Sequence, residues 1–131
     1  MRILIAEDDY VSRRFLTKFL SKYGECDVTV DGLEAIEVFA MSLQERNYYD
    51  LICLDIMMPE VDGIKALRII RKLEDEKNIS KEDKAKVIMT TALNNAEEVM
   101  KTFDYGSHAF AVKPIDTEKL LLVMNKLGLL N

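Results

Sequence analysis

Carboxylates, hydroxyls and a lysine stand where short apolar runs of this sequence end. The stretch LDIMMPEVDG puts Asp55 at the end of the apolar run LICLDI and then turns the chain through Pro59 and Gly63. A strand buried on both faces of a sheet should be continuously apolar, so a charge in that position requires a chemical reason. The corresponding positions after the other apolar runs hold Glu7, Asp8 and Asp9, then Thr90 and Thr91, and finally Lys113 followed by Pro114.

Together these residue types fit the transfer of a phosphoryl group to a carboxylate. A carboxylate such as Glu7 or Asp8 close to Asp55 would repel it and raise a pKa unless a positive charge intervened. A Mg²⁺ ion held by carboxylates, a carbonyl and waters removes that repulsion, and Lys113 supplies a second positive centre. We therefore expect Asp55 to attack phosphorus while Mg²⁺ and Lys113 offset charge on the transferring oxygens and a threonine hydroxyl donates to one of them.

The elements that would position these residues follow from the hydrophobic pattern. Runs rich in β-forming residues predict strands at 2–6, 26–30, 51–56, 86–91 and 108–112. Helical spacing predicts helices at 11–23, 33–43, 64–73, 95–106 and 116–128, the last capped by Asp116 or Thr117. Strict alternation of the two types predicts an α/β, doubly wound parallel sheet covered on both faces. Its functional residues should gather at the carboxyl ends of the strands.

Composition limits the class of protein. The 131 residues are 49% hydrophobic, which fits a single domain over 1–131, and the net charge of −5 argues against direct nucleic-acid binding. The start MRILIAEDD lacks the apolar core of a signal peptide, and LLLVM is too short to span a membrane, so we expect a cytoplasmic protein without membrane contact. Cys26 and Cys53 are expected to be thiols. No DNA-binding or enzymatic domain follows Asn131, so we expect the protein to act through binding.

The sequence resembles the receiver domain of two-component response regulators, including the stand-alone chemotaxis type. The matching pieces run in order over almost the whole chain: ILIAEDD, LDIMMPEVDG, VIMTTA and FAVKP. The resemblance implies a flavodoxin-like, five-stranded sheet with strand order 2-1-3-4-5, which periodicity alone does not provide. It also implies a regulatory domain rather than an enzyme for external substrates, one that catalyses its own phosphorylation and slow dephosphorylation.

The resemblance further implies a role for individual residues at the acidic end of the sheet. Asp55 becomes the phosphoacceptor, with Mg²⁺ as the cofactor. Asp8 becomes a direct metal ligand, while Glu7 acts mostly through water. The backbone carbonyl of Met57 becomes the third protein ligand.

A second group of implied roles concerns the response to phosphorylation. Lys113 becomes the phosphate partner, Thr91 the switch hydroxyl, and Phe110 the switch aromatic at a position where many receivers have tyrosine. The phosphoryl group would come from the phosphohistidine of a sensor histidine kinase or a phosphotransfer protein. A downstream protein would bind the face formed by the fourth helix, the fifth strand and the fifth helix. Met57 and Leu93 would flank the attacking water without orienting it, which predicts a long-lived phosphorylated state and use of a separate phosphatase.

Two other function classes compete with this switch. A Mg²⁺-dependent phosphohydrolase with an aspartyl intermediate would carry a D-x-D motif, but Met57 stands two residues after Asp55. A phosphorylation-independent pseudo-receiver would have lost a carboxylate or the lysine, and none is missing. Structural roles remain open for Asp9 as a helix cap and for Asp62 as a turn former. The charged segment 71–86 is expected to extend the third helix and then form a loop, either solvated or in contact with a partner, and the solvated loop is the favoured interpretation.

Overall fold

The computed structural model describes residues 1–92 and 96–130 and contains one parallel sheet with strand order β2-β1-β3-β4-β5. The strands are β1 (Arg2–Ala6), β2 (Glu25–Thr29), β3 (Leu51–Asp55), β4 (Lys86–Thr91) and β5 (Ala109–Val112). The helices are α1 (Tyr10–Leu20), α2 (Gly32–Gln44), α3 (Gly63–Glu76), α4 (Ala96–Asp104) and α5 (Thr117–Lys126). The predicted alternation and the strand order implied by the resemblance are both confirmed, with differences of a few residues at element ends.

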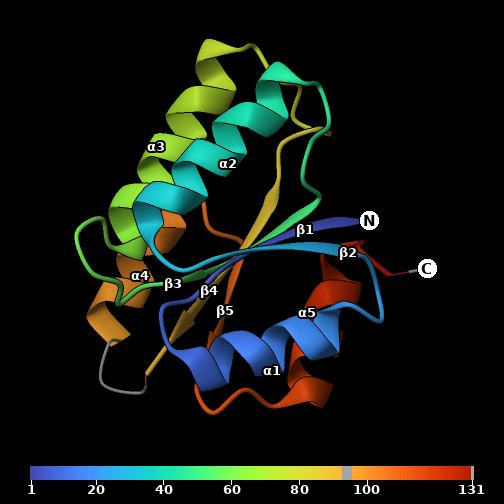
Figure 1. The fold of residues 1–131 in the computed structure, drawn as a ribbon, viewed down its shortest axis with the longest axis vertical. Coiled ribbons are helices and arrows are strands. Elements are labelled where there is room, and N and C mark those ends of the chain that lie inside the picture. The colour runs from blue at the N-terminus through green and yellow to red at the C-terminus, as the bar shows by residue number, and fades with distance from the viewer. Residues whose placement is uncertain (93–95, 131) are drawn as a thin grey trace.

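Helices cover both faces of the sheet, with α1 and α5 on one side and α2, α3 and α4 on the other (Figure 1). Alternate residues of β1 serve the two layers: Ile3 and Ile5 pack in the core beneath α1 and α5, whereas Leu4 and Ala6 pack in the opposite core. All five residues of β3 are buried, because this strand lies in the middle of the sheet and is covered on both sides. The core therefore fixes the position of Asp55 at the end of β3.

Aspartates begin four of the helices. Asp9 caps α1, Asp31 caps α2, Asp62 caps α3 and Asp116 caps α5, and each side chain accepts a hydrogen bond from a backbone N–H in the first turn. This confirms the capping roles predicted for Asp9 and Asp116. Asp62, which with Gly63 fits a turn in the sequence, is instead the residue that starts α3.

The charged segment 71–86 is only partly solvated. Glu74 is 1% exposed, and its carboxylate lies 2.6 Å from the Arg71 guanidinium and accepts a hydrogen bond of 2.9 Å from the Ala85 N–H. Arg71 also donates to the carbonyls of Ala85 and Gly106 at 2.8 Å each. The expectation of a solvated segment is wrong for these two residues, because their ion pair ties the end of α3 to β4 and to the connection between α4 and β5.

Both cysteines are free thiols, as predicted. Cys53 is buried in the core on the α1 and α5 side of the sheet, and this burial raises the pKa of its thiol to about 12. Cys26 is partly exposed, and burial raises the pKa of its thiol as well. Over the described part of the chain, none of the helices combines the length and the apolar character that crossing a membrane would require.

Candidate functional site

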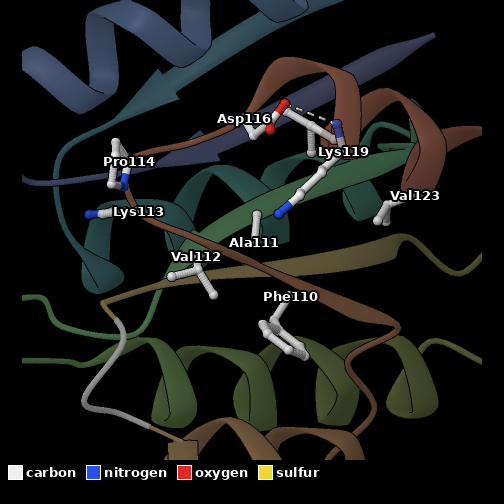
Figure 2. A pocket seen from close by; sticks show the side chains of 9 residues that line it. Phe110, Ala111, Val112, Lys113, Pro114, Asp116, Lys119 and Val123 are labelled. Carbon is white, nitrogen blue, oxygen red and sulfur yellow. Dashed lines mark hydrogen bonds between the residues drawn. The ribbon is translucent and has the colours of Figure 1, made fainter.

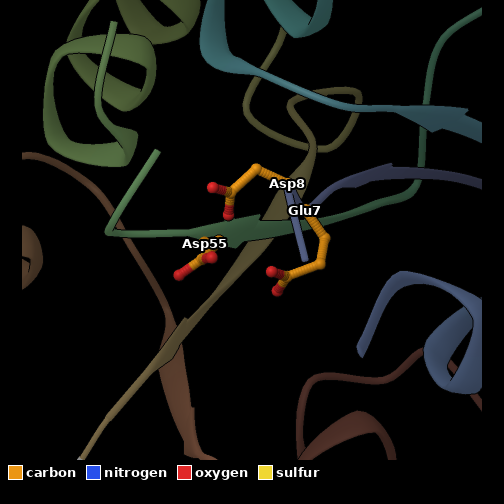
Figure 3. Close-up of side chains that lie close together, drawn as sticks. All are labelled: Glu7, Asp8 and Asp55. Carbon is orange, nitrogen blue, oxygen red and sulfur yellow. The ribbon is translucent and has the colours of Figure 1, made fainter. Parts of the chain in front are cut away.

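Three acidic residues meet at the carboxyl end of the sheet (Figure 3). Glu7 and Asp8 directly follow β1, and Asp55 is the last residue of β3, its neighbour in the sheet. One carboxylate oxygen from each residue lies within 4.8 Å of the other two. The sequence-based expectation that these residues come together is therefore confirmed at the level of geometry.

The three carboxylates differ in their access to solvent. Glu7 is 0% exposed and Asp55 is 3% exposed, whereas Asp8 lies at the surface. Two charges are thus held in place by the protein interior, and the third stands at the opening. A cation entering from solvent would meet Asp8 first and the buried pair behind it.

Lys113, which follows β5, links the two buried carboxylates. Its Nζ lies 2.8 Å from Glu7 Oε2 and 3.0 Å from Asp55 Oδ2. Burial alone would lower the pKa of Lys113, but its close contacts with the Glu7 and Asp55 carboxylates outweigh burial and raise the pKa. The lysine therefore remains an ammonium ion beside Asp55 across the neutral pH range.

One lysine does not neutralise the cluster. Burial, followed by the hydrogen bond and charge of Asp55, raises the pKa of Glu7 from 4.5 to about 7, although Lys113 acts in the opposite direction. Burial and the Asp55 charge also raise the pKa of Asp8. Glu7 Oε2 is buried and makes no hydrogen bond of good geometry, despite its short distance to the Lys113 ammonium.

These observations describe a site that fits a hard divalent cation. Its donors are all carboxylate oxygens, which Mg²⁺ prefers to nitrogen or sulfur ligands. Burial is the main cause of the raised pKa values of Glu7 and Asp8, and the charge of Asp55 adds to it; such a cation would relieve that part of the shift. The Met57 carbonyl stays a prediction as a further ligand.

The loop after β3 folds back tightly onto Asp55. The Met57 N–H donates to Asp55 Oδ1 at 3.2 Å, and the Gly63 N–H donates to the Ile56 carbonyl at 2.9 Å. A Cβ atom at Gly63 would overlap the carbonyl oxygen of Asp55. Gly63 is therefore required by close backbone packing, which explains the glycine in the stretch LDIMMPEVDG.

Thr91 and Phe110 line one cavity of about 250 Å³ on the α4 side of the sheet. The Thr91 side chain is buried and its hydroxyl donates to the Ala92 carbonyl at 3.1 Å. The Phe110 ring is 43% exposed and packs edge-to-face against Phe103, with 6.1 Å between the ring centroids. The two predicted switch residues are thus brought together, with the aromatic ring facing outward. Leu93, predicted to flank the water approach, lies outside the described residues.

A larger cavity of about 520 Å³ lies along β5 and α5 (Figure 2). Phe110 and Lys113 line its β5 side, and Lys119 and Val123 line its α5 side. It forms part of the face that the resemblance implies for a downstream partner. Lys113 lines this cavity and also contacts the acidic cluster through its ammonium group.

Sequence reasoning gave no role to Thr90, the neighbour of Thr91. Thr90 is 1% exposed, and its hydroxyl has no hydrogen-bond partner. It is the register partner of Asp55 across β3 and β4. The sequence does contain one signal, a second hydroxyl at the end of an otherwise apolar strand. Only the structure shows that this hydroxyl is buried and that Thr90 is paired with Asp55.

Comparison with known proteins places these features in a family. Residues 3–125 match the response regulator receiver domain. The chain is 36% identical over 123 residues to the chemotaxis protein CheY of Treponema pallidum, covering 92% of this chain and 77% of that protein. It is also 33% identical over 122 residues to the hybrid signal transduction histidine kinase K of Dictyostelium discoideum, covering 92% of this chain but 10% of that protein.

Solved structures share the fold of this chain. The receiver domain of the histidine kinase CKI1 from Arabidopsis thaliana, complexed with Mg²⁺ and BeF₃⁻, has a TM-score of 0.84 at 28% identity and covers 97% of this chain and 89% of that chain. CheY in the CheX–CheY–BeF₃–Mg²⁺ complex from Borrelia burgdorferi has a TM-score of 0.82 at 28% identity, covering 98% and 89%. With the family match over nearly its whole length, the 2-1-3-4-5 sheet and the acidic strand ends, the chain belongs to the receiver domain family of response regulators.

Proposed function

We propose that residues 1–131 act as one receiver unit in which Asp55 accepts a phosphoryl group and thereby switches partner binding. The observation that carries this proposal is the Lys113 ammonium, 3.0 Å from the buried Asp55 carboxylate within a cluster of three acids. A structural ion pair would need only one carboxylate per lysine. The surplus negative charge at an opening to solvent is instead the arrangement that cation-assisted phosphoryl transfer requires.

In the transfer step, an Asp55 oxygen forms a bond to phosphorus as the bond from phosphorus to its donor breaks. When the donor is a phosphohistidine whose ring carries a proton on its other nitrogen, the imidazole leaves as a neutral ring with the electrons of the P–N bond. The negative charge of the Asp55 carboxylate is then balanced by the positive charge that the ring loses, and the charge of the phosphoryl group does not change. Lys113 pairs with a phosphoryl oxygen, and Met57 N–H, already 3.2 Å from Asp55 Oδ1, holds the carboxylate in place. This is self-phosphorylation by the domain's own residues rather than turnover of an external substrate.

Glu7, Asp8 and Asp55 are the side chains that would hold Mg²⁺, together with the Met57 carbonyl. When bound, Mg²⁺ supplies positive charge for the oxygens of the transferring group. Glu7 remains buried behind Asp8, and its raised pKa means that proton and cation compete for the same carboxylate. Cation binding should therefore strengthen as the pH rises through neutrality.

The signal would leave the domain through the face formed by α4, β5 and α5. The Thr91 hydroxyl would turn toward the phosphoryl group. Phe110 would then move inward into the cavity of about 250 Å³ that Thr91 and Phe110 both line. The phosphoryl donor would be a sensor histidine kinase or a phosphotransfer protein. The downstream partner would be a protein that binds the face formed by α4, β5 and α5. A phosphatase would shorten the signal.

Amide chemical shifts test whether phosphorylation changes this face. Adding acetyl phosphate and Mg²⁺ to the wild-type protein should shift resonances near Asp55 and along α4, β5 and α5. Asp55→Asn should retain the response to Mg²⁺ in part but lose the response to acetyl phosphate. Shifts confined to the loops around Asp55 in the wild-type protein would contradict the switch.

A further inference from the structure

Two buried side-chain oxygens in the described chain make no hydrogen bond, and they flank Asp55. One is Glu7 Oε2, which has an ion-pair partner in Lys113, and the other is the Thr90 hydroxyl, which has none. A buried hydroxyl without a partner costs free energy. Valine has nearly the same shape, suits a strand and would avoid that cost. The hydroxyl at this position therefore indicates a role outside the structure of the resting domain.

Thr90 lies on the same side of the sheet as Asp55. Residues paired in register on parallel strands point to the same face, and Thr90 pairs with Asp55 on β3 and with Ala111 on β5. Ala111 packs against the core beneath α1 and α5, on the side of β5 opposite to Phe110 (Figure 2). Lys113 is two residues beyond Ala111 and starts on this same side. Thr91, in contrast, faces the cavity shared with Phe110.

The side chain of Lys113 has to cross β4 to reach its partners. It starts at the end of β5, and its ammonium contacts Asp55 on β3 and Glu7 after β1, while β4 lies between β5 and β3 in the sheet. Its path therefore runs across the end of β4, the strand in which Thr90 is paired with both neighbours. An ammonium group has three N–H donors. That of Lys113 donates to Asp55 Oδ2 at 3.0 Å and lies 2.8 Å from Glu7 Oε2 without a hydrogen bond of good geometry.

We propose that Thr90 is a positioning residue whose hydroxyl accepts a hydrogen bond from Lys113 while Asp55 is being phosphorylated. The inference rests on the proposed function of Asp55. When Glu7 helps to hold a cation, Lys113 would give up its contact with the Glu7 oxygen. Its ammonium would donate to the neutral Thr90 oxygen instead and would stay next to Asp55. A neutral acceptor fixes the ammonium without competing for its charge, so the charge remains available to a phosphoryl oxygen.

The test compares Thr90→Val with Thr90→Ser. Thr90→Val should lower the rate of phosphorylation by acetyl phosphate at saturating Mg²⁺ by about tenfold, the effect of one hydrogen bond to a charged group. Thr90→Ser should restore the rate to within about twofold of the wild type. Mg²⁺ affinity, measured by calorimetry, should stay the same in both variants. The urea midpoint of Thr90→Val should equal or exceed that of the wild type, because no hydrogen bond is lost in the resting state.

Two further variants separate positioning from a structural effect. Thr29→Val is the matched control, since Thr29 is also a buried strand threonine but its hydroxyl donates to the Ile5 carbonyl at 2.8 Å. It should lower the urea midpoint and leave the phosphorylation rate unchanged. In a Lys113→Met background, Thr90→Val should have less than about a twofold further effect on the rate, because the residue through which it acts is gone.

Three rate measurements could each overturn the inference while leaving Asp55 as phosphoacceptor. They are a Thr90→Val rate within about twofold of the wild type, a Thr90→Ser rate as low as that of Thr90→Val, and a full tenfold effect of Thr90→Val in the Lys113→Met background. A wild-type protein that accepts no phosphoryl group would overturn the proposed function and this inference together. A loss of Mg²⁺ affinity in Thr90→Val would also overturn it, because the residue would then act on the metal site.

Discussion

Replacing Glu7 with glutamine should stabilise the metal-free domain above neutral pH. Glu7 is buried among like charges, which raises its pKa from 4.5 to about 7 in the folded protein. A group with a raised folded-state pKa contributes stability that is fully present below its unfolded-state pKa and is lost as the pH rises through the folded-state value. The wild-type protein without Mg²⁺ should therefore become less stable between about pH 4.5 and about pH 7.

The size of the effect follows from the same shift. A rise from 4.5 to about 7 corresponds to about 3 kcal/mol, at about 1.4 kcal/mol for each pKa unit. This shift already includes the opposing contact with Lys113, whose Nζ lies 2.8 Å from Glu7 Oε2, so about 3 kcal/mol is an upper bound on the gain from Glu7→Gln. We therefore expect a net gain of about 1–2 kcal/mol at about pH 8 and no gain at about pH 5.

Urea unfolding in the presence of a chelator measures this gain. Wild type, Glu7→Gln and the exposed control Glu37→Gln are compared at about pH 5 and about pH 8. Adding Mg²⁺ at the higher pH should then stabilise the wild type more than Glu7→Gln, because only the wild type keeps the full acidic cluster. A Glu7→Gln variant that is less stable than the wild type at the higher pH, or that shows the same pH dependence, would refute the reasoning.

Three further substitutions test the switch, the loop and the core. Thr91→Ala should still accept a phosphoryl group, but amide shifts along α4 and β5 should respond weakly; a response equal to that of the wild type would count against Thr91 as the switch. Gly63→Ala places a Cβ against the Asp55 carbonyl and should lower the free energy of unfolding by about 1–3 kcal/mol and slow phosphorylation, and normal values of both would show that the loop relaxes freely. Glu74→Ala leaves Arg71 unpaired and should cost about 3–5 kcal/mol in urea unfolding, with a loss under about 1 kcal/mol excluding a structural role for the pair.

The periodicity of the sequence was enough to predict the elements that form the site. β3 is continuously apolar up to Asp55, so its burial and the position of its carboxylate follow from local pattern. Parallel strands also bring Glu7 and Lys113 to the same edge without further information. Strand order could not be read in this way, because alternation of strands and helices fits several orders, and it came from the resemblance.

Other features depend on contacts between distant segments. Glu74 looks like one charge among many in its segment, and only the fold shows that it is buried against Arg71 and Ala85. The difference in burial between Glu7 and Asp8, neighbours in sequence, arises because their side chains leave β1 in different directions. Only the register between β3 and β4 shows that Thr90 lies beside Asp55.

The central claim is that Asp55 is the phosphoacceptor, and intact mass measures this directly. The protein is incubated with acetyl phosphate and Mg²⁺, and its mass is compared with that of Asp55→Asn and of Asp83→Asn, an exposed aspartate far along the chain from β3. The account predicts one phosphoryl group on the wild type and on Asp83→Asn, and none on Asp55→Asn. A phosphoryl group that persists on Asp55→Asn, or a wild-type protein that gains none with Mg²⁺ present, would contradict it.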